Sequence, residues 1–170
     1  MPTDPATAFR AMAAPDLPTV AANERACHDD PWTSELLQSS LDHGHHCRLL
    51  VEDEHILGHG IVHITSDEAE ILNLCIIPAA QGAGRGRALL RHLLERARTA
   101  GALEIFLEVR ASNEPAQGLY ESEGFHRVGR RRQYYAGGED GLIMARYLPG
   151  AAEALFTPPA GDPTPADGDR

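Results

Sequence analysis

A glycine-rich segment, Gln81 to Arg87, has the residue types of an anion-binding loop. Its sequence is Gln-Gly-Ala-Gly-Arg-Gly-Arg, and it stands between an apolar run that ends at Ile77 and a segment with helical periodicity that begins at Ala88. Glycines at alternate positions let the backbone approach a ligand with bare N–H groups, and the positive end of a following helix attracts negative charge. The spacing therefore predicts a phosphate or pyrophosphate site between a strand and a helix.

The same spacing excludes two nucleotide-binding motifs. A P-loop ends in Gly-Lys-Ser/Thr, whereas Gly86 is followed by Arg87 and Ala88. In the dinucleotide pattern G-x-G-x-x-G counted from Gly82, the third glycine would fall at Arg87. The pattern that fits is Gln-x-x-Gly-x-Gly. For the loop taken alone, a plain glycine-rich turn without a ligand is the alternative.

Histidines gather in two places that suggest a metal site. His55, His59 and His63 would share one face of a strand, and a second group lies at residues 43–46. Residues two apart on a strand are separated by about 7 Å and residues four apart by about 13 Å, which is too far for one zinc ion. We interpret these side chains as surface or half-buried histidines and expect no metal; adventitious coordination by the second group is the alternative.

Hydrophobic periodicity predicts the elements that position the loop. Strands are expected at residues 9–12, 46–53, 55–65, 68–77, 103–110, 125–135 and 142–148. Helices are expected after Asp16 and after Thr33, at residues 88–100, and after Asn113, whose side chain is suited to an N-cap. We expect one domain over residues 7–149, a flexible start at 1–6 and a disordered tail at 150–170.

Composition narrows the partners and the compartment. The formal net charge of -10 in 170 residues argues against nucleic acid as a direct partner and suits a basic protein or peptide, although the charge taken alone is better explained by solubility. No apolar run approaches the roughly 18 residues of a membrane span, and no secretory signal is visible. We expect a cytoplasmic protein without membrane contact; the oligomeric state is not encoded in these patterns.

The three cysteines follow no metal-binding or redox spacing. We interpret Cys27, Cys47 and Cys75 as reduced thiols of a cytoplasmic protein. Cys75 could be proposed as an acyl-accepting nucleophile, but no histidine is placed to activate it, so a small apolar packing role is favoured.

The Gln-x-x-Gly-x-Gly loop resembles the acyl-CoA pyrophosphate loop of the GNAT (GCN5-related) N-acetyltransferases. Segments 31–33, 107–113, 119–125 and 131–135 are similar to the RimI-type group within that family, which acetylates the N-terminal alanine of the eighteenth small-subunit ribosomal protein. The resemblance runs from about Phe9 to Leu148. It implies an α/β (α+β) fold whose mixed, mostly antiparallel sheet of about seven strands is flanked by about four helices. A splayed cleft between the fourth and fifth strands is implied as well.

The resemblance also implies roles for individual residues. The residues implied to bind acetyl-CoA are Leu74, Cys75, Ile76, Gly82, Ala83, Gly84, Arg85, Gly86, Arg87 and Asn113. Glu108 matches the family's general base and Tyr120 its general acid. Two positions depart from the family pattern. Gly82 stands where a basic residue is usual, a loss that the two loop arginines would offset, and Ile77 replaces a usual acidic residue.

The implied roles agree with elementary chemistry. An α-amine has a pKa of about 8, so a carboxylate acting through a water suffices as its base, and a phenol can protonate a departing thiolate. Each residue also has a structural alternative: a solvent-facing strand carboxylate for Glu108 and a packed core ring for Tyr120. An oxyanion hole would use a backbone N–H near Cys75 or Ile76, provided the strand is bulged there.

Aromatic and acidic residues predict a groove for the acceptor. Trp32, Tyr134 and Tyr135 would hold the flat or aliphatic parts of a peptide, and Glu139 and Asp140 would suit a basic one. The Arg130–Arg132 run opposes that charge logic. We interpret it as an exposed strand edge, with salt bridges to nearby carboxylates as the alternative.

The sequence thus predicts an acetyl-CoA-dependent enzyme that acetylates a protein N-terminal amine, with a small-subunit ribosomal protein as acceptor. A lysine or small-amine acetyltransferase is the alternative within the family. Outside it, a non-catalytic acyl-CoA-binding module would need the loop but neither Glu108 nor Tyr120.

Overall fold

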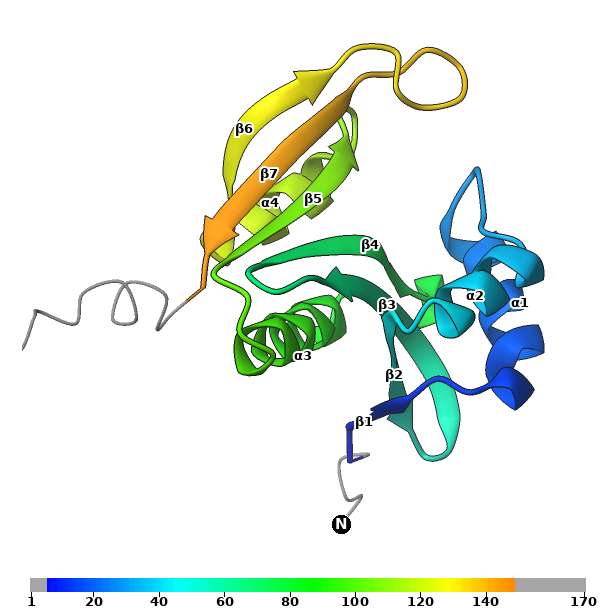
Figure 1. Ribbon diagram of the computed structural model, residues 1–170. Helices are drawn as coiled ribbons and strands as arrows, with labels where there is room; N and C mark the ends of the chain where they lie inside the picture. Colours follow the sequence, from blue (N-terminus) through cyan, green and yellow to red (C-terminus); the bar gives the residue numbers. More distant parts are fainter. Residues whose placement is uncertain (1–5, 149–170) are drawn as a thin grey trace, which may run out of the picture.

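The computed structural model describes residues 6–148, which form one seven-stranded sheet with helices on both faces (Figure 1). The segments expected to be a flexible start and a disordered tail fall almost entirely on residues 1–5 and 149–170, outside the described residues. The strands are β1 (Ala8–Ala11), β2 (His46–Glu52), β3 (His55–Ile64), β4 (Glu68–Ile76), β5 (Glu104–Arg110), β6 (His126–Arg131) and β7 (Gly141–Tyr147). The helices are α1 (Leu17–Cys27), α2 (Ser34–Asp42), α3 (Arg85–Thr99) and α4 (Glu114–Ser122).

The sheet is mixed and mostly antiparallel, as expected. Its order is β1-β2-β3-β4-β5-β7-β6, and β4 with β5 is its parallel pair. These two strands pair over four residues each, from Glu68 with Glu104 to Ile71 with Leu107. Beyond Leu107 the strands separate, and Figure 1 shows β5, β6 and β7 diverging from the half built on β1–β4. The predicted splayed opening between the fourth and fifth strands is therefore present.

Two layers of helices cover the sheet. The helices α1 and α2 pack on β2 and β3 through one buried apolar cluster, whereas α3 and α4 pack on the opposite face in a larger cluster. Helix α3 supplies a continuous apolar stripe that includes Leu90, Leu93 and Ala97, the i, i+3, i+4 spacing that produced the helical prediction. Within residues 6–148, no helix is long and apolar enough to cross a bilayer.

Most boundaries agree with the predicted ones to within about one residue, and two differ by more, each for a local reason. Strand β6 ends at Arg131 instead of residue 135, because Gln133 has a φ of 52° and its N–H donates to Asp140. Tyr134 and Tyr135 consequently lie in the loop before β7 and not on a strand. Helix α3 begins at Arg85 instead of Ala88, because Gly84, with a φ of 79°, turns the chain directly into the helix.

Candidate active site

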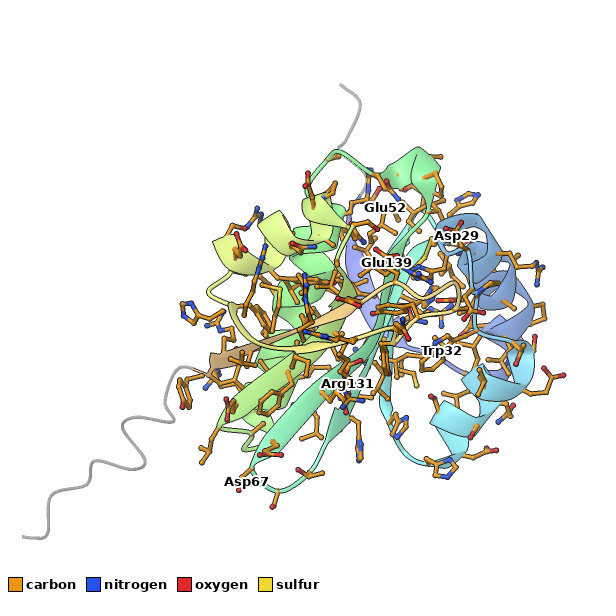
Figure 2. The ribbon with its side chains drawn as sticks, turned by 90° about the horizontal axis from the view of Figure 1, so that it is seen from above. Asp29, Trp32, Glu52, Asp67, Arg131 and Glu139 are labelled. Atoms are coloured by element: carbon orange, nitrogen blue, oxygen red, sulfur yellow. A yellow bond between two sulfur atoms is a disulfide. The ribbon has the colours of Figure 1, made fainter. Side chains whose placement is uncertain are left out.

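A cleft of about 780 Å³ opens where β4 and β5 separate. Strand β4, strand β5, the start of α4, the α1–α2 connection and the β6–β7 loop all contribute to its wall. Figure 2 shows Asp29 and Trp32 on the α1–α2 side, with Glu139 and Arg131 toward the β6–β7 side. The lining includes both predicted catalytic residues, the three predicted acceptor residues and two of those predicted for acetyl-CoA, namely Glu108, Tyr120, Trp32, Tyr134, Tyr135, Leu74 and Asn113, but none of the glycine loop. Residues that are distant in sequence thus meet in one cavity.

Glu108 lies at the junction of this cleft and a second hollow of about 360 Å³. Its side chain is 13% exposed, so it is neither a freely solvated surface carboxylate nor a fully buried one. Oε1 accepts from Arg131 Nε at 2.9 Å, and Oε2 is buried without a partner among the described residues. Since Glu108 lines both cavities, its carboxylate is the group there that is suited to accepting a proton from an acceptor amine or from a bridging water.

Tyr120 reaches the cleft from α4, opposite β4. It is 8% exposed, and its ring packs against Phe125 with centroids 5.8 Å apart. Burial, with a smaller contribution from Tyr135, raises the pKa of Tyr120 to about 12. The phenol is therefore protonated throughout the neutral range and is able to donate its proton. The Tyr120 ring is packed in the core and also reaches the cleft. The two roles that were alternatives at the level of sequence are therefore compatible.

The open edge of β4 presents backbone groups from alternate residues. The Ile77 N–H donates to Leu57 of β3, and Cys75 pairs with His59 in the same register. Because N–H directions alternate along a strand, the amides of Leu74 and Ile76 point away from β3. Gln81 Nε2 donates to the Ile76 carbonyl at 2.9 Å, as this orientation requires.

This register corrects the expected role of Cys75, whose backbone groups belong to the β3 ladder and are not offered to the cleft. A bulge is present in β4, but it lies at Leu72, where the register with β3 shifts, and not beside Ile76. The amides of Leu74 and Ile76 are thus free because β4 and β5 separate, and not because β4 is bulged near Ile76 as predicted.

The glycine loop ends in an uncapped helix start. Gly82 and Gly84 have φ values of 84° and 79°, and no atom lies within 4 Å of where a side chain on either would begin. The first helical hydrogen bond runs from Ala88 N to Gly84 O, so the amides of Arg85, Gly86 and Arg87 precede it. Open space beside unpaired helical amides is the geometry that binding of an anion such as pyrophosphate requires.

The two loop arginines correct one expectation. Arg85 makes a bidentate ion pair with Glu52, 2.9 and 2.8 Å, and Arg87 pairs with Glu123. Their guanidinium groups are thus engaged by carboxylates and do not replace the basic residue missing at Gly82. The cation count at this loop is lower than the sequence suggested, so its attraction for an anion depends chiefly on backbone amides and the α3 dipole.

Asn113 caps α4, as predicted. Its side-chain oxygen accepts from Ala116 N at 3.2 Å, while the residue also lines the cleft. The side-chain nitrogen is therefore the group left for a ligand.

The acceptor side of the cleft is less acidic than expected. Glu139 accepts from Ser112 N and pairs with Arg110, and Asp140 pairs with Arg130. Both interpretations of the Arg130–Arg132 run therefore hold, because β6 is an edge strand and both Arg130 and Arg131 make salt bridges. Available negative charge lies instead at Asp29 and Asp30 in the cleft, and at Glu68 and Glu70 in the adjoining hollow.

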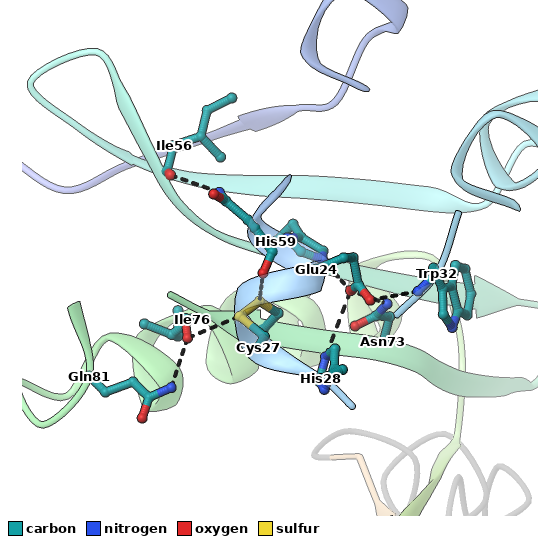
Figure 3. Close-up of a disulfide and its surroundings, with 11 residues drawn as sticks. Glu24, Cys27, His28, Trp32, Ile56, His59, Asn73, Ile76 and Gln81 are labelled. Carbon is teal, nitrogen blue, oxygen red and sulfur yellow. Dashed lines mark hydrogen bonds and ion pairs between the residues drawn. A yellow bond between two sulfur atoms is a disulfide. The ribbon is translucent and has the colours of Figure 1, made fainter. Parts of the chain in front are cut away.

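A buried polar network beneath the cleft was not predicted. Glu24 is fully buried and accepts from His59 and Asn73, each at 2.6 Å, and from Trp32 N at 3.0 Å (Figure 3). His59 is thus a buried residue and not a surface or half-buried one. Burial acts to raise the pKa of Glu24, but the hydrogen bonds from His59 and Trp32 outweigh it, and the pKa is lowered. The signal available in the sequence was a carboxylate on the apolar side of a predicted helix.

The cysteines differ from the expectation of three reduced thiols. Cys27, at the end of α1, is joined to Cys75 of β4 by a disulfide, with Cα atoms 6.2 Å apart (Figure 3). Cys47 is free and buried. The donor atoms of Glu24, His28 and Cys75 lie within 4.8 Å of one another. This grouping is not a ready metal site, because the Cys75 sulfur is bonded to Cys27 and Glu24 Oε1 already accepts two hydrogen bonds.

Comparison with known proteins places these features in a family. The model of the acetyltransferase (GNAT) family matches residues 10–125. The chain is 37% identical over 133 residues to the ribosomal protein bS18-alanine N-acetyltransferases of Salmonella typhimurium and Escherichia coli K12, covering 76% of this chain and 90% of each relative. The solved Escherichia coli enzyme superposes with a TM-score of 0.79 at 34% identity, covering 84% of this chain and 94% of that one. Ard1 from Thermoplasma volcanium shares the fold, with a TM-score of 0.80 at 21% identity.

Proposed function

The chain belongs to the GNAT family of acetyltransferases, and we propose that it transfers acetyl from acetyl-CoA to the N-terminal alanine of the eighteenth small-subunit ribosomal protein in the cytoplasm. The observation that carries the proposal is one cavity at the β4–β5 separation that brings Glu108 and Tyr120 together. The names of the relatives support the acceptor, and the chain covers 90% of their length.

Acetyl-CoA would lie with its pyrophosphate on the amides of Arg85, Gly86 and Arg87 and its thioester along the open edge of β4. The amide nitrogen of Asn113 would contact the same co-substrate. The N–H groups of Leu74 and Ile76 point toward that space and would stabilise negative charge on the carbonyl oxygen.

In the proposed reaction the acceptor α-amine loses a proton to Glu108, directly or through a water, and attacks the thioester carbon. The carbon–sulfur bond then breaks, and Tyr120 gives its proton to the departing thiolate. An α-amine with a pKa of about 8 is partly neutral at physiological pH, so a carboxylate base is sufficient. Trp32, Tyr134 and Tyr135 would line the path of the first acceptor residues.

The exposed carboxylates support a basic acceptor. Asp29 and Asp30 border the cleft, and Glu68 and Glu70 border the hollow on the other side of Glu108. A chain with net charge -10 would attract a positively charged ribosomal protein and speed its encounter.

The test uses purified protein, acetyl-CoA and three basic peptides: one with a free N-terminal alanine, one with the same sequence but a blocked terminus, and one with a free terminal serine. We expect CoA release and a single acetyl mass increment on the free alanine, none on the blocked peptide, and less on serine. Acetylation of internal lysine in the blocked peptide would instead favour a lysine acetyltransferase. Acetyl-CoA binding without transfer to any amine would favour a binding module.

A further inference from the structure

The Cys27–Cys75 disulfide joins two walls of the cleft. Cys27 is the last residue of α1, and the segment that follows it, including His28 and Trp32, lines the acceptor side. Cys75 lies in β4 between Leu74 and Ile76, the residues whose backbone groups face the cleft. Cys27 Sγ is 3.4 Å from the Ile76 carbonyl oxygen on this open edge. The covalent bond therefore connects the acceptor wall with the strand that would carry the thioester.

The three cysteines have different access to solution reagents. Cys27 is half-buried and lines the cleft, so its side chain borders the cavity that a small thiol or disulfide would enter. Cys47 is buried in the α1–α2 core, and burial raises the pKa of its thiol to about 11. Since the thiolate is the reactive form, Cys47 is protected both by access and by protonation. Exchange chemistry would thus be confined to the Cys27–Cys75 pair.

We propose that Cys27 and Cys75 form a reversible disulfide modification site, which sets the position of the acceptor wall and with it the affinity for the protein acceptor. In the oxidised protein the bond holds the end of α1 against β4. Reduction breaks the covalent link between these elements and requires the two sulfur atoms to move apart, which frees the end of α1 to shift relative to β4 at the cleft. The proposed effect on acceptor affinity rests on the proposed acetyltransferase function, whereas the disulfide chemistry does not.

The chemistry is thiol–disulfide exchange with a low-molecular-weight disulfide of the glutathione type. A Cys27 thiolate attacks one sulfur of the small disulfide, releases one small thiol and leaves a mixed disulfide. The Cys75 thiolate then attacks Cys27 Sγ and releases the second small thiol. Two protein thiols are oxidised to one disulfide, one small disulfide is reduced to two thiols, and the two thiol protons pass to the departing thiolates. Reduction is the reverse sequence, and no metal or other oxidant is required.

The disulfide itself is tested by mass spectrometry on the full chain. The protein is equilibrated in glutathione buffers of graded ratio, quenched in acid, denatured and alkylated. We expect one alkylated cysteine, Cys47, in oxidising buffer and three in reducing buffer, with a Cys27–Cys75 linked peptide that appears and disappears reversibly. Three alkylated cysteines in every buffer, or a linked peptide that excess thiol does not open in the native protein, would overturn the proposal.

The functional consequence is tested by kinetics in the same buffers. In the wild type we expect the KM for the acceptor peptide to rise severalfold on reduction, while acetyl-CoA affinity by calorimetry stays within twofold. The dependence on buffer should persist in Cys47→Ser and be lost in Cys27→Ala. A dependence that persists in Cys27→Ala contradicts the assignment. If no peptide is acetylated, the alkylation result still decides whether the disulfide site exists.

A metal ion would bind through the same cysteine sulfur atoms, and an assay of metal retention distinguishes a metal site from a disulfide site. The reduced protein is incubated with Zn²⁺, freed of excess ion and analysed for bound metal. We expect no stoichiometric retention, because Glu24 is already occupied by His59 and Asn73. One equivalent of zinc retained by the wild type and lost in Cys27→Ala would replace the disulfide proposal with a metal site.

Discussion

Arg131 Nε lies 2.9 Å from Glu108 Oε1, so the carboxylate proposed as base is held by a cation that reaches across β7 from the edge strand β6. The arginine engages one carboxylate oxygen and leaves the other directed into buried space without a partner among the described residues. Arg131 also lies over the Tyr134 ring at 5.2 Å. One side chain therefore orients both the proposed base and an aromatic residue of the acceptor wall.

We predict that Arg131→Gln lowers kcat by about tenfold, because a carboxylate that is free to rotate spends less time in the productive geometry. Arg131→Lys should restore part of the loss. The matched control is Arg130→Gln, since Arg130 is also on β6 but pairs with Asp140 and lines neither the cleft nor the adjoining hollow that Arg131 borders. Steady-state kinetics with the alanine peptide measures the effect, and a kcat within twofold of wild type for Arg131→Gln would remove Arg131 from the mechanism.

Glu108→Gln should lower turnover by about 10²- to 10⁴-fold, the usual contribution of a general base, while the affinity for acetyl-CoA is kept. The amide has a similar shape but does not accept the amine proton. Glu104→Gln on the same strand is the control, because Glu104 does not line the cleft. Turnover that matches the wild type across pH would show that another group is the base.

Tyr120→Phe should reduce kcat by about 10²-fold with little change in acetyl-CoA binding, because the ring still fills its site against Phe125. The pH profile provides an independent check. The rate of the wild type should rise as the acceptor amine loses its proton near pH 8 and then stay level to pH 10. Burial raises the pKa of Tyr120 to about 12, so the phenol is protonated over this whole range. An enzyme-specific fall between pH 8 and pH 10 would contradict the assignment.

Gly84→Val should weaken acetyl-CoA binding by at least tenfold in calorimetry, because the new side chain occupies the open space at the start of α3. Left-handed backbone also disfavours valine by about 1–2 kcal/mol, so a matched control is needed. Gly44→Val supplies it, since Gly44 has a φ of 71° and equally open surroundings but lies after α2. Equal acetyl-CoA affinities in the two variants would exclude the loop as the pyrophosphate site.

Glu24→Gln should destabilise the protein by about 3 kcal/mol at pH 7, as expected for breaking a buried charged network. The folded protein lowers the pKa of Glu24, so its carboxylate contributes stability above the unfolded pKa, and that contribution is lost as the pH falls through the folded pKa. The difference between wild type and variant should therefore shrink below about pH 4. Urea unfolding at several pH values measures it, with exposed Glu35→Gln as the control. A difference independent of pH would indicate a packing effect alone.

The order of the elements could be predicted because their causes are local. The apolar stripe of α3, the cap at Asn113 and the alternation along β5 each depend on residues within a few positions of one another. The glycine loop was predictable for the same reason, since Gly82 and Gly84 adopt backbone angles that most other residues avoid. The errors in this category were at boundaries, where Gln133 ended β6 early and Gly84 started α3 early.

The family resemblance supplied what periodicity could not. It indicated that Glu108 and Tyr120 act together, although nothing in their spacing brings a strand residue and a helix residue to one cavity. The structure places both in the cleft wall, and it assigns the free backbone amides to Leu74 and Ile76 instead of Cys75. That correction depends on a strand register, which shifts at Leu72 without a sequence signal.

By itself, the sequence predicted which segments are strands and helices and where a phosphate would find bare amides, and its resemblance to the family indicated Glu108 and Tyr120 as the candidate base and acid. The tertiary structure alone decided that Arg131 holds Glu108, that Arg85 and Arg87 are engaged by carboxylates, and that Cys27 meets Cys75 across 48 residues of chain. The physical reason is the distance along the chain between the residues that interact. Secondary structure follows from neighbours along the chain, whereas these pairings exist only once strand order and register have brought distant residues within a few ångströms.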